Sequence, residues 1–126
     1  MVIEPLPSPL AFQLGGVRMA VASTAETGAV SAATVLVFEQ IGDIVSGRYR
    51  GGSIVDGYLI GSLTGNILHF RYVQADASGQ VDAGVSQGEL VSLADGRIRM
   101  IERFVWTTRQ GTGTNVFEEI QHACEP

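Results

Sequence analysis

The chain contains no lysine, and all eight of its basic residues are arginines. A Schiff-base lysine, a P-loop lysine and a lysine general base are therefore excluded. The sequence has one cysteine, Cys124, and two histidines. A single thiol makes no internal disulfide, and one cysteine with two histidines makes no zinc site. We therefore expect neither a metal nor a cofactor.

Long apolar runs are missing as well, because none approaches the roughly 20 residues that a transmembrane helix needs. The first residues do not read as a signal peptide, since they lack a basic segment and prolines interrupt the apolar stretch. This predicts a cytoplasmic protein with no membrane partner. The net charge of −5 disfavours nucleic acid as a partner, because phosphate binding needs a basic face.

Proline is absent from the middle of the chain, with none between Leu10 and Glu125. Three of the four prolines lie within residues 1–10. Because proline fixes φ and donates no hydrogen bond, these ten residues are predicted to form an extended arm. The proline-free stretch leaves every ladder position of a β-sheet available.

What the sequence does have is a regular series of turns that contain glycine. They are Thr27-Gly28, Gly42-Asp43, Gly51-Gly52, Gly65-Asn66, Ser78-Gly79, Asp95-Gly96 and Gly111. The segments between them are rich in Val, Ile, Phe, Tyr and Thr and run for roughly ten residues, the rhythm of an antiparallel meander. The predicted fold is all-β: a single closed antiparallel up-and-down barrel of about eight strands, lipocalin/avidin-like, with an interior that can hold a ligand.

The turns divide the chain into predicted strands and a simple domain organisation. The strands are Phe12–Thr24, Ala33–Ile41, Ile44–Arg50, Ser53–Thr64, Asn66–Asp76, Gln80–Ala94, Arg97–Thr108 and Thr114–Gln121. The organisation is a proline-rich arm (1–10), a β-barrel domain (11–121) and a C-terminal tail (122–126). Residues Val30–Val37 also have the composition of a short helical turn, although Thr34 and Val35 favour a strand.

Alternation of side chains along each strand predicts which residues face the interior. The inward set is Val17, Met19, Val21, Val45, Gly47, Tyr49, Val55, Gly57, Leu59, Gly61, Leu63, Leu68, Phe70, Tyr72, Ile98, Met100, Glu102, Phe104 and Trp106. The fourth strand is ambiguous, since Ile54, Asp56, Tyr58, Ile60 and Ser62 form a competing set; we favour the first set because it leaves Asp56 in water. The outward faces carry most of the arginines, interrupted by Ile67, Val73, Ile101 and Val105. An apolar stripe on the outside of a barrel indicates a subunit interface, so we expect a homodimer.

Glycines within the predicted strands are a second informative feature. They are Gly47, Gly57, Gly61, Gly84 and Gly88. Glycine weakens a strand locally, and it is tolerated where a barrel bends sharply or where space is needed inside. The sequence leaves both interpretations open.

Several motifs carry a resemblance to a known group of proteins. The segment Tyr49–Gly61 is followed by Arg71-Tyr72 and by Asp95–Arg99, with Glu102 and Trp106 behind them. Over Val17–Ile120 the chain resembles short bacterial proteins that often carry the name N-acetylglutamate synthase. The resemblance implies a small lipocalin- or avidin-like barrel of unproven function. An acetyl-CoA-dependent transferase needs a pyrophosphate loop at a helix N-terminus, whereas the glycine-rich Gln110–Thr114 precedes a strand.

Glu102 is the candidate catalytic residue, because alternation places its carboxyl group among apolar side chains. A carboxyl group that is desolvated without a cation has a raised pKa, the property of a general acid or base or of a ligand anchor. The structural alternatives are that Tyr49, Tyr72 or Ser86 bonds it, or that it lies in water at the barrel mouth. Glu119, on the last strand, would join Glu102 as a second carboxylate if it pointed inward.

Aromatic side chains on the inward faces predict a cavity that binds an apolar or aromatic ligand. The predicted ligand-binding residues are Tyr49, Phe70, Tyr72, Phe104, Trp106 and Glu119. Three functions remain open on this basis. The first is a small-molecule-binding barrel, the second is a cofactor-free isomerase, cyclase or hydratase that uses Glu102, and the third is a structural or interaction protein with a packed core.

Overall fold

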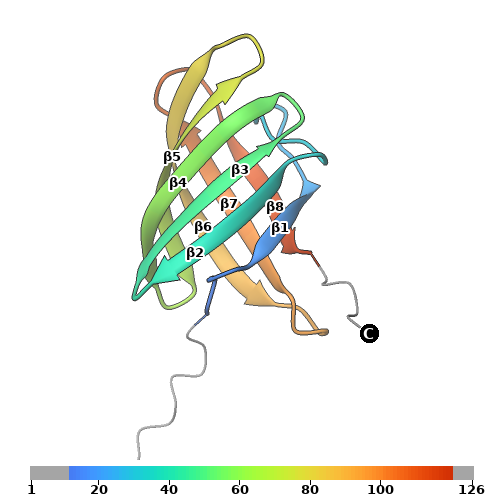
Figure 1. Ribbon diagram of the computed structural model, residues 1–126, viewed down its shortest axis with the longest axis vertical. Coiled ribbons are helices and arrows are strands. Elements are labelled where there is room, and N and C mark those ends of the chain that lie inside the picture. Colours follow the sequence, from blue (N-terminus) through green and yellow to red (C-terminus); the bar gives the residue numbers. More distant parts are fainter. Residues whose placement is uncertain (1–11, 121–126) are drawn as a thin grey trace, which may run out of the picture.

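The chain forms one closed antiparallel barrel (Figure 1). The computed structural model describes residues 12–120. Its strands are β1 (Arg18–Ser23), β2 (Val35–Ile41), β3 (Ile44–Gly51), β4 (Ile54–Thr64), β5 (Ile67–Asp76), β6 (Val81–Ser92), β7 (Ile98–Trp106) and β8 (Thr112–Glu119). Each strand pairs with the next, and β8 pairs with β1 to close the wall. The predicted closed, eight-stranded, up-and-down barrel is confirmed.

The predicted strand boundaries are correct for most of the wall but too long at the first strand, since β1 begins at Arg18 rather than at Phe12. The alternative of a short helical turn over Val30–Val37 is not observed. This segment has a turn at residues 32–33 and then enters β2 at Val35. Residues 12–120 contain no helix long and apolar enough to cross a bilayer. The arm at residues 1–10 and the tail at 122–126, which includes Cys124, lie outside the described residues.

Short turns with glycine in the left-handed region connect the central strands. Gly42 (φ 60°) and Gly65 (φ 61°) occupy the first of two turn positions, in the β2–β3 and β4–β5 connections. Glycine at the first central position is the signature of the type II′ turn, whose twist matches that of the paired strands. These two glycine turns therefore fix the pairing of the strands that they connect, and they lie where the sequence predicts turns.

A β-bulge in β4 corrects the prediction for the faces of the fourth strand. The register between β4 and β5 shifts between Ile54 and Asp56, so Val55 lies outside with 59% of its surface exposed and Ile54 is buried. Beyond the bulge the predicted alternation holds, and Leu59 and Leu63 point inward. A bulge inserts one extra residue and reverses the faces on one side of it, which alternation alone does not reveal.

Several glycines within the strands lie opposite aromatic residues, whereas Gly88 lies opposite Leu68 and Glu102. Tyr49 pairs with Gly57, Phe70 with Gly61, Tyr72 with Gly84 and Phe104 with Gly113. A Cβ atom at Gly57 would lie 2.5 Å from the Tyr49 ring, and one at Gly84 would overlap the phenol group of Tyr72. The rings thus occupy the space above the glycines. These glycines therefore make room for aromatic rings, which fill much of the interior.

The two ends of the barrel differ in how tightly they are filled. We call the end with the β1–β2 loop (residues 24–34) and the β7–β8 loop (residues 107–111) the loop end. At the opposite end, the lumen is packed with apolar side chains that are almost fully buried. They include Leu14, Met19, Phe38, Val45, Leu68, Leu90 and Met100. Within residues 12–120, this packing leaves the loop end as the place for a site inside the barrel.

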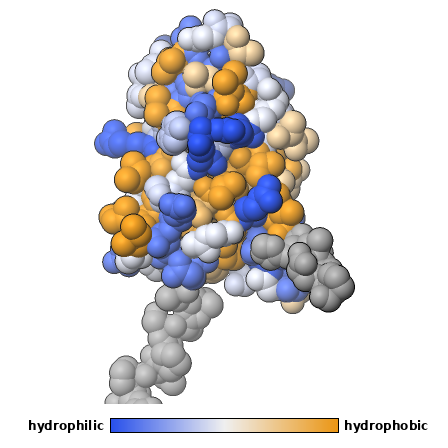
Figure 2. Space-filling view, viewed as in Figure 1, coloured by the Kyte–Doolittle hydropathy of each residue, from blue (hydrophilic) through white to orange (hydrophobic). Residues whose placement is uncertain are grey.

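The outer wall combines exposed apolar residues with charged residues. Figure 2 shows the face formed by β1 to β4, where hydrophobic side chains lie beside a polar cluster. Arg48 contacts Asp56 at 3.0 Å, and Arg50 approaches the same carboxylate at 3.7 Å. Around this cluster Ile60 and Tyr58 have 60% and 49% of their surface exposed. The outward alternation of arginines with apolar residues is therefore as predicted.

Candidate functional site

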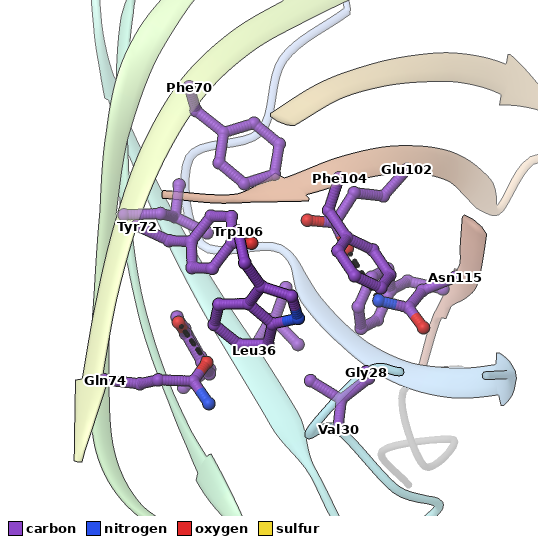
Figure 3. A pocket seen from close by; sticks show the side chains of 13 residues that line it. Gly28, Val30, Leu36, Phe70, Tyr72, Gln74, Glu102, Phe104, Trp106 and Asn115 are labelled. Atoms are coloured by element: carbon purple, nitrogen blue, oxygen red, sulfur yellow. Dashed lines mark hydrogen bonds between the residues drawn. The ribbon is translucent and has the colours of Figure 1, made fainter. Parts of the chain in front are cut away.

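A small pocket lies inside the barrel at the loop end (Figure 3). Its cavity has a volume of about 30 Å³. Its walls come from six of the eight strands and from the β1–β2 loop. The lining residues are Gly28, Val30, Leu36, Tyr49, Leu59, Phe70, Tyr72, Gln74, Glu102, Phe104, Trp106, Asn115 and Phe117. Since a cavity of roughly 10–15 Å³ holds one water molecule, this space is suited to a small group rather than to a large ligand.

The apolar walls of the pocket are rings in edge-to-face contact. Tyr72 meets Trp106 with ring centroids 5.3 Å apart and an interplanar angle of 74°, and Phe104 meets Trp106 at 5.9 Å and 70°. Figure 3 shows the Trp106 indole between the other two rings. Such pairs stabilise beyond the area that they bury. The rings hold one another in place and give the pocket fixed apolar walls.

Glu102 lies in the pocket wall and is bonded by two polar side chains. Ser86 Oγ donates to its Oε2 at 2.6 Å, and Asn115 Nδ2 donates to its Oε1 at 3.0 Å. The residue is 7% exposed. Burial raises the pKa of Glu102 above its ordinary value, and the hydrogen bonds from Ser86 and Asn115 counteract part of that rise. Both of these partners, Ser86 and Asn115, are uncharged.

The two tyrosine hydroxyls of the pocket differ in their bonding. Tyr49 Oη donates to Gln74 Oε1 at 2.9 Å. Within residues 12–120, by contrast, Tyr72 Oη is buried and has no hydrogen-bond partner. Burial raises the pKa of both hydroxyls, and the carboxyl group of Glu102 raises both further. Both tyrosines are therefore neutral at physiological pH, and Tyr72, whose side chain lines the pocket, has an unused donor.

The β1–β2 loop closes this end of the barrel and is bonded to the pocket walls. The amide of Ala25 donates to Asn115 Oδ1 at 3.1 Å. The indole Nε1 of Trp106 donates to the carbonyl of Thr27 at 2.9 Å. Gly28 and Val30 complete the pocket lining from the loop side. Because two wall residues also hold the loop, the cover and the pocket form one hydrogen-bonded unit.

The structure brings together most of the residues that the sequence singled out. Six of them line the pocket: Tyr49, Phe70, Tyr72, Glu102, Phe104 and Trp106. The predicted ligand-binding residue Glu119 does not line it, so the pair with Glu102 that an inward Glu119 would have made does not form. Glu102 lies opposite Asn115, and β8 runs away from the loop end, so Glu119 reaches the opposite end and its Oε1 accepts from the amide of Ile98 at 3.1 Å. Of the predicted partners of Glu102, Ser86 is present.

Two polar residues of the pocket were missed in the sequence analysis. Gln74 continues the inward alternation of Phe70 and Tyr72, and Asn115 shares its parity with the buried Phe117. Extending the alternation to polar residues would have found both. Their partners depend on the register between strands, which one sequence does not provide. In the described part of the chain, no cluster of three His, Cys, Asp or Glu residues is placed to hold a metal ion.

A closed antiparallel meander of eight strands with a pocket at one end is the architecture of the small up-and-down β-barrels. Residues 12–120 match the family described as Avidin-like protein. The chain therefore belongs to the avidin-like protein family. This agrees with the avidin-like part of the resemblance and gives no support to the name N-acetylglutamate synthase. No curated protein and no solved structure matches the chain.

Proposed function

We propose that this barrel binds a small uncharged molecule, apolar or aromatic in its body, with one hydrogen-bonding group. The observation that carries the proposal is the hydroxyl of Tyr72, which is buried and unpartnered within residues 12–120. A buried polar group without a partner costs about 1–3 kcal/mol, and such a cost is retained where the group serves a ligand. The site residues of this proposal are Tyr49, Phe70, Tyr72, Phe104 and Trp106.

The charge of the pocket supports an uncharged ligand. No arginine or histidine is among the lining residues, and the lining contains one acidic group, Glu102. An anionic group buried there would have no counterion and would face this carboxyl group, which is unfavourable at low dielectric. Donors suited to an uncharged carbonyl or hydroxyl are available from Tyr72 and from the amide of Gln74. The aromatic rings provide the apolar contact.

The size of the pocket sets a condition on binding. A cavity of about 30 Å³ is smaller than most organic ligands, so a larger molecule enters only when the β1–β2 loop moves away. The loop is bonded to two wall residues. Its displacement would open the pocket to solvent at the loop end. Binding with loop displacement is therefore part of the proposal, and no reaction is assigned to Glu102, whose oxygens both accept bonds from neighbours.

Native mass spectrometry of the protein purified from its own cells tests this function. We expect a fraction of the protein to carry a small molecule that is released on denaturation. The Tyr72→Phe variant, purified in the same way, should carry it at a level reduced about tenfold, since the loss of a buried hydrogen bond costs roughly 1.4 kcal/mol or more. A matched Tyr58→Phe variant changes a tyrosine on the outer wall and should retain it.

Two results would count against ligand binding. One is a wild-type protein that carries nothing and whose unfolding temperature does not change with any member of a panel of neutral amides and phenols. The other is equal loading of wild type and Tyr72→Phe. The first result would favour the packed-core protein, in which the interior serves stability alone.

A further inference from the structure

Arg109, in the β7–β8 loop, contacts both the cover of the pocket and the wall beneath it. Its guanidinium carbon lies 4.2 Å from the centroid of the Trp106 ring. Its NH2 group donates to the carbonyl of Thr27 at 3.1 Å. The same carbonyl accepts from Trp106 Nε1 at 2.9 Å. The carbonyl oxygen of Thr27 in the β1–β2 loop thus accepts from two donors, one in β7 and one in the β7–β8 loop.

Arg109 is itself held in position by a buried carboxylate. Its NH1 group approaches Asp82 Oδ2 at 3.5 Å, and Thr108 Oγ1 donates to the other oxygen of Asp82 at 2.8 Å. Asp82 is 4% exposed and belongs to β6, a strand of the rigid wall. The guanidinium fork therefore connects β6, the indole of Trp106 and the β1–β2 loop, a role that suits arginine because its donors are planar and fixed.

Further contacts at the mouth favour this arrangement. Thr27 Oγ1 donates to the carbonyl of Thr112 at 2.8 Å. A Cβ atom at Gly111 would lie 3.1 Å from Thr27 Cβ and 3.1 Å from Trp106 Cδ1. The close approach of the two loops therefore depends on the glycine at position 111. The polar contacts converge on the Thr27 segment of the loop. Ala29 and Val30 pack against the core, and the Ala29 carbonyl accepts one long hydrogen bond, from Ser53 Oγ at 3.4 Å.

We infer that Arg109 is a positioning residue that latches the β1–β2 loop over the pocket and controls the exchange of a small uncharged ligand. The inference rests on the proposed function for its ligand, but the latch itself is testable without one. Opening the loop requires that Thr27 leave both Arg109 and Trp106. Loss of Arg109 lowers this barrier for entry and for exit together, so it changes the rates of exchange more than the affinity.

Trp106 is the single tryptophan of the chain, so its fluorescence reports directly on access to the pocket. The probe is acrylamide, a small neutral amide that quenches indole fluorescence by collision. Wild type should be quenched weakly, because Trp106 is 6% exposed. Arg109→Ala should raise the collisional quenching constant about threefold or more as the loop opens locally. Arg103→Ala, which removes an exposed arginine from the outer wall of β7, is the matched control and should match wild type.

Two measurements keep the inference testable if Arg109→Ala folds poorly. Asp82→Asn leaves Arg109, Thr27 and Trp106 in place but removes the charge that orients the guanidinium, and it should raise the quenching constant in the same direction. In the unmodified protein, the amide of Ala25 should exchange its hydrogen at least about tenfold faster than amides in the middle of β5 and β6.

The latch is overturned if folded Arg109→Ala shows the quenching constant of wild type, or if the amide of Ala25 is as protected as the central strands. These results are separate from the fate of the proposed function. A protein that carries no ligand but opens in Arg109→Ala has the latch without the function. A protein that carries a ligand and whose quenching does not respond to Arg109→Ala has the function without the latch.

Discussion

Tyr72 and Trp106 meet edge to face in the barrel, with ring centroids 5.3 Å apart, but only one of their two polar atoms has a partner. Trp106 Nε1 donates to the carbonyl of Thr27, while Tyr72 Oη has no partner among residues 12–120. The satisfied atom points to the loop that covers the pocket. The unsatisfied atom belongs to a residue that lines the pocket, and this difference underlies the first prediction.

Replacing each buried tyrosine by phenylalanine should change stability in opposite directions. Tyr72→Phe removes an unsatisfied hydroxyl and should raise the free energy of unfolding by about 1 kcal/mol. Tyr49→Phe removes the donor to Gln74 Oε1 and should lower it by about 1 kcal/mol. Urea unfolding of the ligand-free proteins measures both. Equal destabilisation by the two changes would show that Tyr72 Oη has a partner in solution.

Glu102 should make the protein less stable as the pH rises. Burial raises the pKa of Glu102 in the folded state above the ordinary value of 4.5, which applies to the unfolded state. At a pH between the unfolded-state pKa and the folded-state pKa, the folded protein therefore holds more protons than the unfolded protein. The free energy of unfolding therefore falls as the pH rises through this window and stays lower above it.

Glu102→Gln should abolish this contribution to the decline, because glutamine is neutral and still bonds to Ser86 and Asn115. We expect the variant to match wild type near pH 4 and to be more stable by about 1 kcal/mol at pH 7. Glu39→Gln, an exposed change on the outer wall of β2, serves as the control. A variant that is less stable than wild type at pH 7 would indicate that the ionised carboxylate is well compensated by its partners.

A methyl group at Gly57 should destabilise the barrel, because the space above it is occupied by the Tyr49 ring. The added Cβ would lie 2.5 Å from that ring, and Tyr49 is 4% exposed and has little room to move. Overpacking of this kind costs about 1–3 kcal/mol. Gly15→Ala, whose closest contact at 3.2 Å is the exposed Gln13 side chain, should be close to neutral. Thermal unfolding compares the two variants.

The apolar residues of the outer wall should hold two copies of the chain together. Ile60 and Val105 are 60% and 46% exposed, and Arg71 and Val85 connect them across β5 and β6. Burying such a surface favours a homodimer. Sedimentation at micromolar concentration should show a dimer for wild type and a monomer for Ile60→Asp. A wild-type monomer would contradict the prediction.

The fold was accessible from the sequence because its determinants are local. Turns such as Gly42-Asp43 and Gly65-Asn66 mark where strands end, and alternation in β7 correctly places Met100, Glu102 and Phe104 inside. The bulge near Val55 was not accessible, because a single extra residue leaves no local signal. The pairing of Glu102 with Asn115 rather than Glu119 depends on the register of β7 and β8, which is a property of the whole sheet.

The pocket was predicted less well than the wall that surrounds it. The aromatic residues were found by their parity, but the sequence left open whether the interior is hollow, because it does not show Tyr49 and Tyr72 lying over their glycine partners, Gly57 and Gly84. How large a cavity remains depends on the rotamers of several rings at once. The contacts of Arg109 depend on two loops that meet only in the closed barrel, so sequence patterns do not reveal them.

The central claim is that the loop end of this barrel holds a small uncharged ligand bonded to Tyr72 Oη. A crystal structure of the protein purified from its own cells tests it most directly. The account predicts electron density for a small molecule between Tyr72 and Trp106, within hydrogen-bond distance of Tyr72 Oη. Residues 24–34 either close over the molecule or are displaced by it. A closed barrel in which that hydroxyl contacts only protein atoms or an isolated water molecule would contradict it.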